Sequence, residues 1–269
     1  DNWPRVIQIA WQLHDEMGHL IEAQDFLVQP DGFDIPYDAE RIHGISTALA
    51  QKEGIPLVEM LEKFNIALSK TKFVVGQNLK FDLNVTGSEF VRAQISNDLQ
   101  ELPVLDTCTE HTANLCKIPG GRYGKFKLPT LTELHQFLFN QSFGEAHNAT
   151  ADVEATTRCF LELLRKGQYA SEKLGFEEGY MARFRESNPT TIPPVGIQHI
   201  NLKKASERLH TDDSPEISKE EIKENLNELS DAKFVHLHSH SQFSILQSTA
   251  SVKDLVEAAA ANNMQTVTM

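Results

Sequence analysis

The chain has 269 residues, of which 40% are hydrophobic and 23% are charged, so it can hold one large domain or two ordinary ones. No apolar run approaches the roughly 18 residues that a bilayer requires, so we exclude a membrane-spanning protein. Three cysteines are too few for disulfide bonds to stabilise a chain of this size, so we expect a cytoplasmic, bacterial protein. The net charge of −13 argues against broad binding of duplex nucleic acid, although metal ions held by carboxylates could still bind a few phosphates.

The first part of the chain is predicted to be a mixed α/β domain, residues 1–166. Residues 5–13 and 19–28 are expected to form an antiparallel hairpin. Residues 46–68 carry the spacing of an amphipathic helix, with Pro56 in its first turn.

Short strands and helices are expected to alternate after this hairpin. The strands are predicted at residues 72–75 and 102–105, and the helices from about Lys80 and at residues 130–139 and 153–164. Strands followed by helices predict layers with a mixed sheet, in which the hairpin supplies the antiparallel part.

The rest of the chain changes in character. Residues 167–231 are expected to form a linker region that includes a short helix at residues 218–229, and residues 232–269 to open a second domain with a strand and a helix. The first residue is not methionine and the last residues begin a β-branched run, so we also expect the chain to continue at both ends.

Two short stretches carry the residue types of a metal-dependent hydrolase. In the stretch that runs from Gln77 through Asn78 to Asp82, a strand ends and a carboxylate stands at the start of a helix, where open α/β sheets usually bind ligands. In the second stretch His147 precedes Asp152, and the two converge if His147 lies in the loop before the helix. A neutral histidine beside a metal-binding carboxylate suits a general base, but each aspartate could instead serve only a helix dipole.

Together these stretches resemble motifs II and III of the DnaQ-like, or DEDDh, 3′-to-5′ exonucleases. Three further landmarks match in order, at residues 42–46, 104–107 and 128–134. The resemblance covers residues 5–165 and implies a ribonuclease H-like mixed sheet with flanking helices.

The resemblance also implies a site that acts on the single-stranded 3′ end of DNA. Asp82 and Asp152 would bind two Mg²⁺ or Mn²⁺ ions, and His147 would take the proton from the attacking water. Asn78, Gln77 and His43 would touch the terminal nucleotide.

The family also has motif I, an Asp-x-Glu pair on its first strand, and here that strand is missing. Asp38-Ala39-Glu40 has the right letters but follows Pro36, after the predicted hairpin, and is a false match. We expect the first strand and its carboxylates upstream of Asp1, so residues 1–269 are expected to be inactive by themselves.

The segment at residues 119–127 combines three cations with two aromatic rings. It lacks the glycine and the Ser or Thr that a phosphate-binding P-loop requires. Two interpretations stay open, namely a flexible loop and a surface that meets a single-stranded phosphate backbone by stacking and charge.

Near the end of the chain, every second residue from His236 to His240 is a histidine. Alternate residues of a strand point to the same side, so His236, His238 and His240 share one face of the predicted strand. Three imidazoles on one face, without acidic neighbours, favour a bound transition metal or a bound phosphate. This segment resembles the opening of a PHP (β/α) barrel, in particular the one at the head of bacterial DNA polymerase III alpha subunits. The whole chain then resembles an alpha subunit that carries its own proofreader, with the rest of that polymerase chain and the replicase as partners.

Three functions remain open at this point. The first is a proofreading 3′-to-5′ exodeoxyribonuclease within a replicative polymerase. The second is a DEDDh exoribonuclease, since no residue is known to meet the sugar 2′ position. The third is a non-catalytic docking module of the polymerase, which would keep the fold but lack the Asp-x-Glu pair.

Overall fold

The computed structural model describes residues 3–143, 148–169, 177–196 and 201–213, together with Glu257 and Ala261. Contacts divide the chain into two compact units, Asp1–Thr211 and Asp212–Met269, and nearly all described residues belong to the first. The elements predicted at residues 218–229, 234–240 and 251–262 lie outside the described residues, apart from two helical positions within the last of these ranges.

The predicted hairpin is confirmed. Strand β1 (Gln8–His14) pairs antiparallel with β2 (Leu20–Leu27), and Trp11 lies opposite Gln24. The side chain of Asp15 closes the turn by accepting hydrogen bonds from the backbone N–H groups of Met17 and His19.

The two short strands form a second, parallel sheet. Strand β3 (Val74–Gly76) pairs with β4 (Val104–Asp106), so that Gly76 lies opposite Asp106. Parallel pairing brings the carboxyl ends of both strands to one edge. Residues that follow β3 and β4 in the sequence therefore meet in space.

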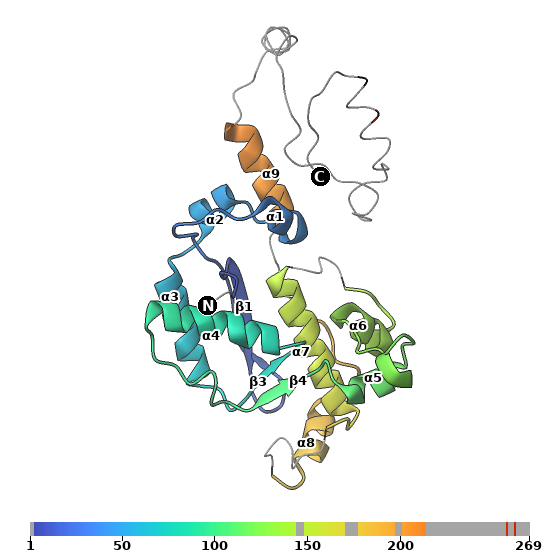
Figure 1. The fold of residues 1–269 in the computed structure, drawn as a ribbon. Coiled ribbons are helices and arrows are strands. Elements are labelled where there is room, and N and C mark those ends of the chain that lie inside the picture. The colour runs from blue at the N-terminus through green and yellow to red at the C-terminus, as the bar shows by residue number, and fades with distance from the viewer. Residues whose placement is uncertain are drawn as a thin grey trace. The chain divides into compact units, whose positions relative to one another are not determined.

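The described helices surround these strands (Figure 1). Their bounds are α1 Tyr37–His43, α2 Thr47–Glu53, α3 Leu57–Leu68, α4 Lys80–Ala93, α5 Glu110–Cys116, the 3₁₀ turn Arg122–Gly124, α6 Leu131–Phe139, α7 Ala149–Arg165, α8 Tyr180–Ser187 and α9 Leu202–Asp213. Helices α4, α6 and α7 confirm three predicted helices, whereas α1, α5, α8 and α9 were not predicted.

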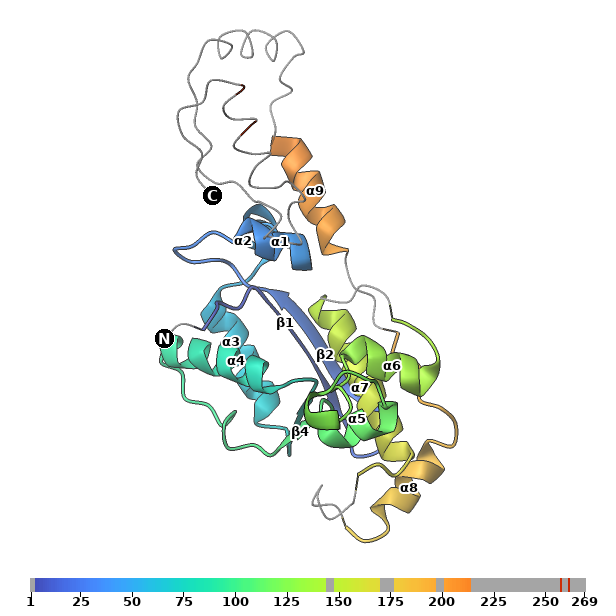
Figure 2. The ribbon, with the colours of Figure 1, turned by 45° about the vertical axis from the view of Figure 1, so that its right-hand side comes forward.

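The same helices pack against both sheets, although among the described residues no strand pairing joins the two sheets. Helix α7 contacts both β1 and β3, and Figure 2 shows it alongside the hairpin from a second direction. On the opposite face, Ile9 of β1 and Val74 of β3 pack against one hydrophobic cluster that includes Met60 of α3 and Phe90 of α4. The strands thus lie between α7 on one side and α3 with α4 on the other.

The prediction of one helix over residues 46–68 is wrong, because the sheet interrupts it. Ser46 caps α2 by accepting a hydrogen bond from the Leu49 N–H. Ile55 then bonds to the end of β2, donating to the Leu27 carbonyl and accepting from the Gln29 N–H. Pro56 immediately precedes α3 rather than lying in its first turn. A backbone that serves the sheet edge at Ile55 cannot continue a helix.

The compact unit extends past the predicted domain boundary at residue 166. Helix α8 buries Tyr180 and Phe184 against Phe160 of α7. Near the start of α9, Leu202 packs beside α1 and α2, and the buried Ser206 hydroxyl donates to the Gly44 carbonyl. Part of the predicted linker region is therefore packed structure. None of the helices that the structure describes combines the length and the apolar character needed to cross a bilayer.

Candidate functional site

Asp82 lies in the first turn of α4, on a turn that Asp106 holds in place. One carboxylate oxygen of Asp106 accepts hydrogen bonds from the N–H groups of Asn78 (2.9 Å) and Cys108 (2.7 Å), and the other accepts from the Leu79 N–H (2.9 Å). A carboxylate from β4 thereby satisfies N–H groups at the start of a helix that has no capping side chain of its own. The position of Asp82 depends on Asp106.

Asn78 and Gln77 have different roles in this turn. Asn78 is exposed and has a positive φ of 59°, a conformation that asparagine tolerates better than most residues. Gln77 donates from its amide nitrogen to the Pro129 carbonyl (2.8 Å) and accepts from the Thr107 hydroxyl. Gln77 therefore ties the turn to the protein, whereas Asn78 stands at the surface beside Asp82.

Asp152 is positioned by the way α7 begins. Asn148 caps the helix by accepting a hydrogen bond from the Thr150 N–H, so α7 begins directly after it. The same turn is attached to the hairpin, since the Ala149 N–H donates to the Gln8 side chain (3.2 Å) and the Thr150 hydroxyl donates to Asp25. Asp152 is half-buried in this first turn.

The two predicted metal ligands converge, although 69 residues separate them in the sequence. Asp82 is exposed on one side, but protein atoms around it remove part of its hydration. This partial burial, together with the negative charges of Asp106 and Asp152, raises the pKa of Asp82 from 3.8 to about 6. The site therefore concentrates negative charge from α4, β4 and α7.

Replacing Asp152 with asparagine is expected to lower the pKa of Asp82 below about 6, because one of the charges that oppose its ionisation is removed. Carbon-13 NMR titration of the Asp82 carboxyl in metal-free protein measures this shift. Asp31→Asn is a suitable control, since Asp31 is exposed and is not among the causes of the Asp82 shift. An unchanged Asp82 pKa in Asp152→Asn would mean that the two carboxylates do not interact.

A divalent cation fits this donor set. Carboxylate oxygens are ligands that Mg²⁺ and Mn²⁺ prefer, and a cation would neutralise the repulsion that raises the pKa of Asp82. Asp106 has its oxygens engaged by backbone N–H groups, which leaves Asp82 and Asp152 as the candidate ligands. Within the part of the chain that the structure describes, no three ligand-type side chains form a complete metal-binding group. The described residues thus offer two carboxylates to a cation.

The other predicted site residues divide into two groups. His43 ends α1, and its Nδ1 accepts a hydrogen bond from the Ile45 N–H (3.1 Å). Burial lowers its pKa against the opposing effect of Glu40, so the ring stays neutral near pH 7. No interaction among the described residues joins His43 to Asp82. His147, His236, His238 and His240 lie outside the described residues.

Sequence reasoning treated Asp106 only as a landmark and missed its role in the site. The available signal was its place at the end of a short strand, directly before Thr107. Had the parallel pairing of β3 with β4 been foreseen, Asp106 would have been expected opposite Gly76 and next to the turn before Asp82.

Family models match two parts of the chain. The family model for the exonuclease domain (RNase_T) matches residues 4–160, and that for the PHP domain matches residues 236–269. A search of curated proteins gives no match.

Solved structures of Exonuclease I have a similar fold. The crystal structure of E. coli Exonuclease I in complex with a dT13 oligonucleotide matches with a TM-score of 0.51 and 21% identity, over 64% of this chain and 41% of that one. Another structure of Exonuclease I matches with a TM-score of 0.50 and 23% identity, over 60% of this chain and 37% of that one. The chain thus spans well under half the length of these structures. The length of the sequence match and the shared ribonuclease H-like fold place this chain in the exonuclease family.

Proposed function

We propose that the chain contributes the catalytic module of a 3′-to-5′ exonuclease that hydrolyses single-stranded DNA. The observation that carries the proposal is that Asp82 and Asp152 lie close enough for their charges to repel, an effect that adds to partial burial and to the charge of Asp106 in raising the pKa of Asp82. Family membership supports nuclease activity, and the neighbouring Exonuclease I structures include complexes with single-stranded oligonucleotides.

In the proposed reaction Asp82 and Asp152 hold the divalent cations, and His147 accepts the proton of the attacking water. Cations held by these carboxylates would supply polarisation of the phosphodiester and would stabilise the charge that develops on it. The water oxygen forms a new bond to phosphorus while the bond to the 3′ oxygen of the preceding nucleotide breaks. The products are a nucleoside 5′-monophosphate and a strand that is one nucleotide shorter.

The proposal includes a further strand, which lies between β1 and β3 and carries the Asp-x-Glu pair of motif I. The described strands form two separate sheets, although α7 covers both and one hydrophobic cluster unites residues of both. A strand that paired with β1 and β3 would join them into one mixed sheet and would end close to Asp82. Activity is therefore measured with any natural sequence that precedes Asp1 included.

We further propose that this module belongs to a replicative polymerase, as its proofreading exonuclease. The support is the PHP domain match at residues 236–269, next to the exonuclease domain in the same chain. Tethering to a polymerase would supply the 3′ end at a high effective concentration, which a chain of net charge −13 needs more than a basic protein would. A non-catalytic docking module and an exoribonuclease are the alternatives.

Digestion of end-labelled oligonucleotides tests the proposal. A 5′-labelled single strand should be shortened stepwise from its 3′ end when Mg²⁺ or Mn²⁺ is present, and EDTA should stop the reaction. A DNA strand should be digested faster than the matching RNA strand. Absence of digestion with either metal would support the docking module, and faster digestion of RNA would support the exoribonuclease.

A further inference from the structure

The segment between Glu110 and Glu133 differs in charge from the rest of this acidic chain. It contains no aspartate or glutamate, but it has four cations, which are Lys117, Arg122, Lys125 and Lys127. Lys125 pairs with Glu110 and Lys127 pairs with Glu133 (2.7 Å). Arg122 is exposed and has no carboxylate partner among the described residues, so its charge is available to a ligand.

Tyr123 projects from the tip of this segment. Its side chain is 97% exposed, and it has a positive φ of 57°, which is unusual for an aromatic residue. The tip is closed by a hydrogen bond from the Lys127 N–H to the Ile118 carbonyl (2.8 Å). A large exposed ring in an uncommon backbone conformation, next to Arg122, has no role in the packing of the domain.

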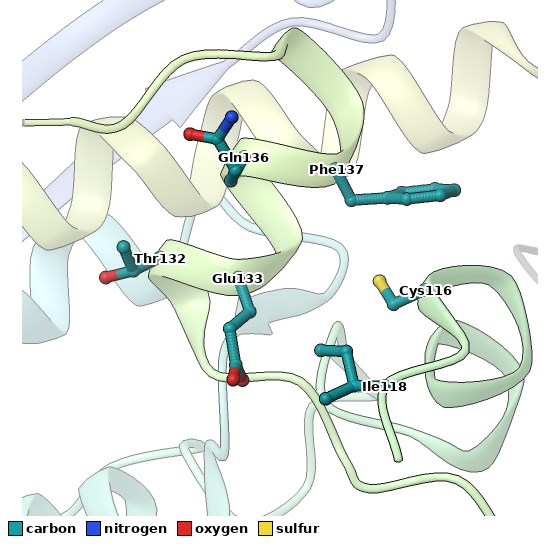
Figure 3. Close-up of a pocket in the computed structure, with 6 residues that line it drawn as sticks. All are labelled: Cys116, Ile118, Thr132, Glu133, Gln136 and Phe137. Carbon is teal, nitrogen blue, oxygen red and sulfur yellow. The ribbon is translucent and has the colours of Figure 1, made fainter.

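A hollow lies at the base of this segment, between the end of α5 and α6 (Figure 3). Its volume is about 360 Å³, and it is lined by Cys116, Ile118, Thr132, Glu133, Gln136 and Phe137. Figure 3 shows Phe137 on one side with Cys116 and Ile118 facing it. The Phe137 ring is 48% exposed, and burial together with Glu133 raises the pKa of Cys116 to about 11, so the thiol is neutral. A hollow that has Phe137 and Ile118 as apolar lining and Glu133 and Gln136 as polar lining can accept a planar, polar-edged group.

The same segment is attached to the turn that carries Asp82. The Pro129 carbonyl accepts a hydrogen bond from the Gln77 amide (2.8 Å) and a weaker one from the Cys108 thiol (3.6 Å). The Lys127 ammonium donates a hydrogen bond to Glu133. Glu133 and Thr130 together form the capping box of α6. The end of the segment at Pro129 therefore lies next to the turn that leads to Asp82.

We propose that Arg122, Tyr123 and Phe137 form a second contact for single-stranded DNA, in which the rings stack on bases and Arg122 pairs with a phosphate. This inference rests on the proposed function, since it assumes a single strand as the ligand. Stacking on exposed rings combined with a cation is how proteins hold single strands without reading their sequence. The contact would hold the strand behind the nucleotide that is being removed.

Fluorescence anisotropy of a labelled oligothymidylate in EDTA tests this contact without requiring hydrolysis. Tyr123→Ala and Phe137→Ala are each expected to weaken binding by about 5- to 100-fold, and Tyr123→Trp to retain it, because stacking is lost in the first two and kept in the third. Arg122→Gln is expected to reduce the salt dependence of log K by about 0.7, the value for one phosphate contact on a single strand. Both rings are exposed, so the folded structure should tolerate their removal.

Two control variants lie away from the segment. Tyr37→Ala removes another ring that is 73% exposed, and Lys52→Gln removes an exposed cation of α2; neither should change binding or its salt dependence. Unchanged affinity in Tyr123→Ala and Phe137→Ala, or an unchanged salt slope in Arg122→Gln, would overturn the second contact. Absence of binding by the unaltered protein would also overturn it.

Digestion by Asp82→Asn, measured in parallel, separates this inference from the proposed function. If Asp82→Asn loses digestion and the variants at Arg122 and Tyr123 bind DNA as the unaltered protein does, the proposed exonuclease is supported and the second contact is rejected. Full digestion by Asp82→Asn would reject the proposed catalytic role of Asp82, while the anisotropy in EDTA would still decide the second contact.

Discussion

Asp82→Asn is expected to slow digestion of single-stranded DNA by at least about 10², because it removes a proposed ligand of the catalytic cations. In many metal sites, removing a residue that only supports a metal ligand already lowers metal affinity or activity by about 10- to 100-fold. Loss of a ligand itself should lower activity by no less. The measurement is the initial rate of shortening of a 5′-labelled strand with saturating Mg²⁺. Asp31→Asn, at an exposed position away from the site, should digest at the unaltered rate.

The same substitution is expected to raise the stability of the metal-free protein at neutral pH. The pKa of Asp82 is raised in the folded protein from 3.8 to about 6, so the folded state binds more protons than the unfolded state between these values. Stability contributed by Asp82 therefore decreases as the pH rises through this range, and the ionised carboxylate destabilises the fold above it. Asparagine removes that charge.

Thermal unfolding in EDTA checks this second effect. Asp82→Asn should have a higher Tm than the unaltered protein at neutral pH, and the difference should disappear at a pH below 3.8, where both forms are uncharged at this position. Mg²⁺ should raise the Tm of the unaltered protein and have little effect on the variant. A lower Tm for Asp82→Asn at neutral pH would contradict the repulsion inferred at the site, and an unchanged digestion rate would remove Asp82 from the metal ligands.

Local signals in the sequence were sufficient to predict the parts of the fold that depend on local interactions. The hairpin followed from two apolar runs at turn distance, and α6, which was predicted at residues 130–139, begins in the structure with a capping box of Thr130 and Glu133. The start of α4 and the place of Asp82 in its first turn also followed from the sequence. These features require only residues that are close in the chain.

The features that were missed depend on residues far apart in the chain. Helix α8 is short and carries two arginines and a glutamate, and only its packing against α7 gives Tyr180 and Phe184 their buried positions. The break at Ile55 depends on the end of β2 rather than on the helix pattern. Asp106 is one acidic residue among many until the parallel pairing of β3 with β4 brings it beside Asn78. Such roles require the tertiary structure to be known.

A buried glutamate on α4 is another feature that the sequence did not predict. Glu89 is fully buried, and one of its carboxylate oxygens accepts hydrogen bonds from the Arg5 side chain (2.9 Å) and the Val6 N–H (3.0 Å). The same oxygen lies 3.2 Å from the Arg92 guanidinium. Glu89 therefore fixes the segment that leads into β1 to the helix that carries Asp82.

Glu89→Gln is expected to lower the free energy of unfolding by about 3 kcal/mol. Breaking a buried charge pair by removing one partner typically costs about 3 to 5 kcal/mol, and the lower end applies because the Arg5 and Arg92 side chains remain 35% and 26% exposed and can be partly hydrated. Glutamine keeps the volume of the side chain, so the loss measures the charge and its hydrogen bonds rather than a cavity. Urea denaturation, monitored through the fluorescence of Trp11, which is buried in β1, gives the free energy of unfolding. Glu59→Gln serves as the matched control, because the exposed Glu59–Lys63 ion pair contributes less than about 1 kcal/mol. Equal stabilities of Glu89→Gln and Glu59→Gln would show that the buried carboxylate does not hold the start of β1 to α4.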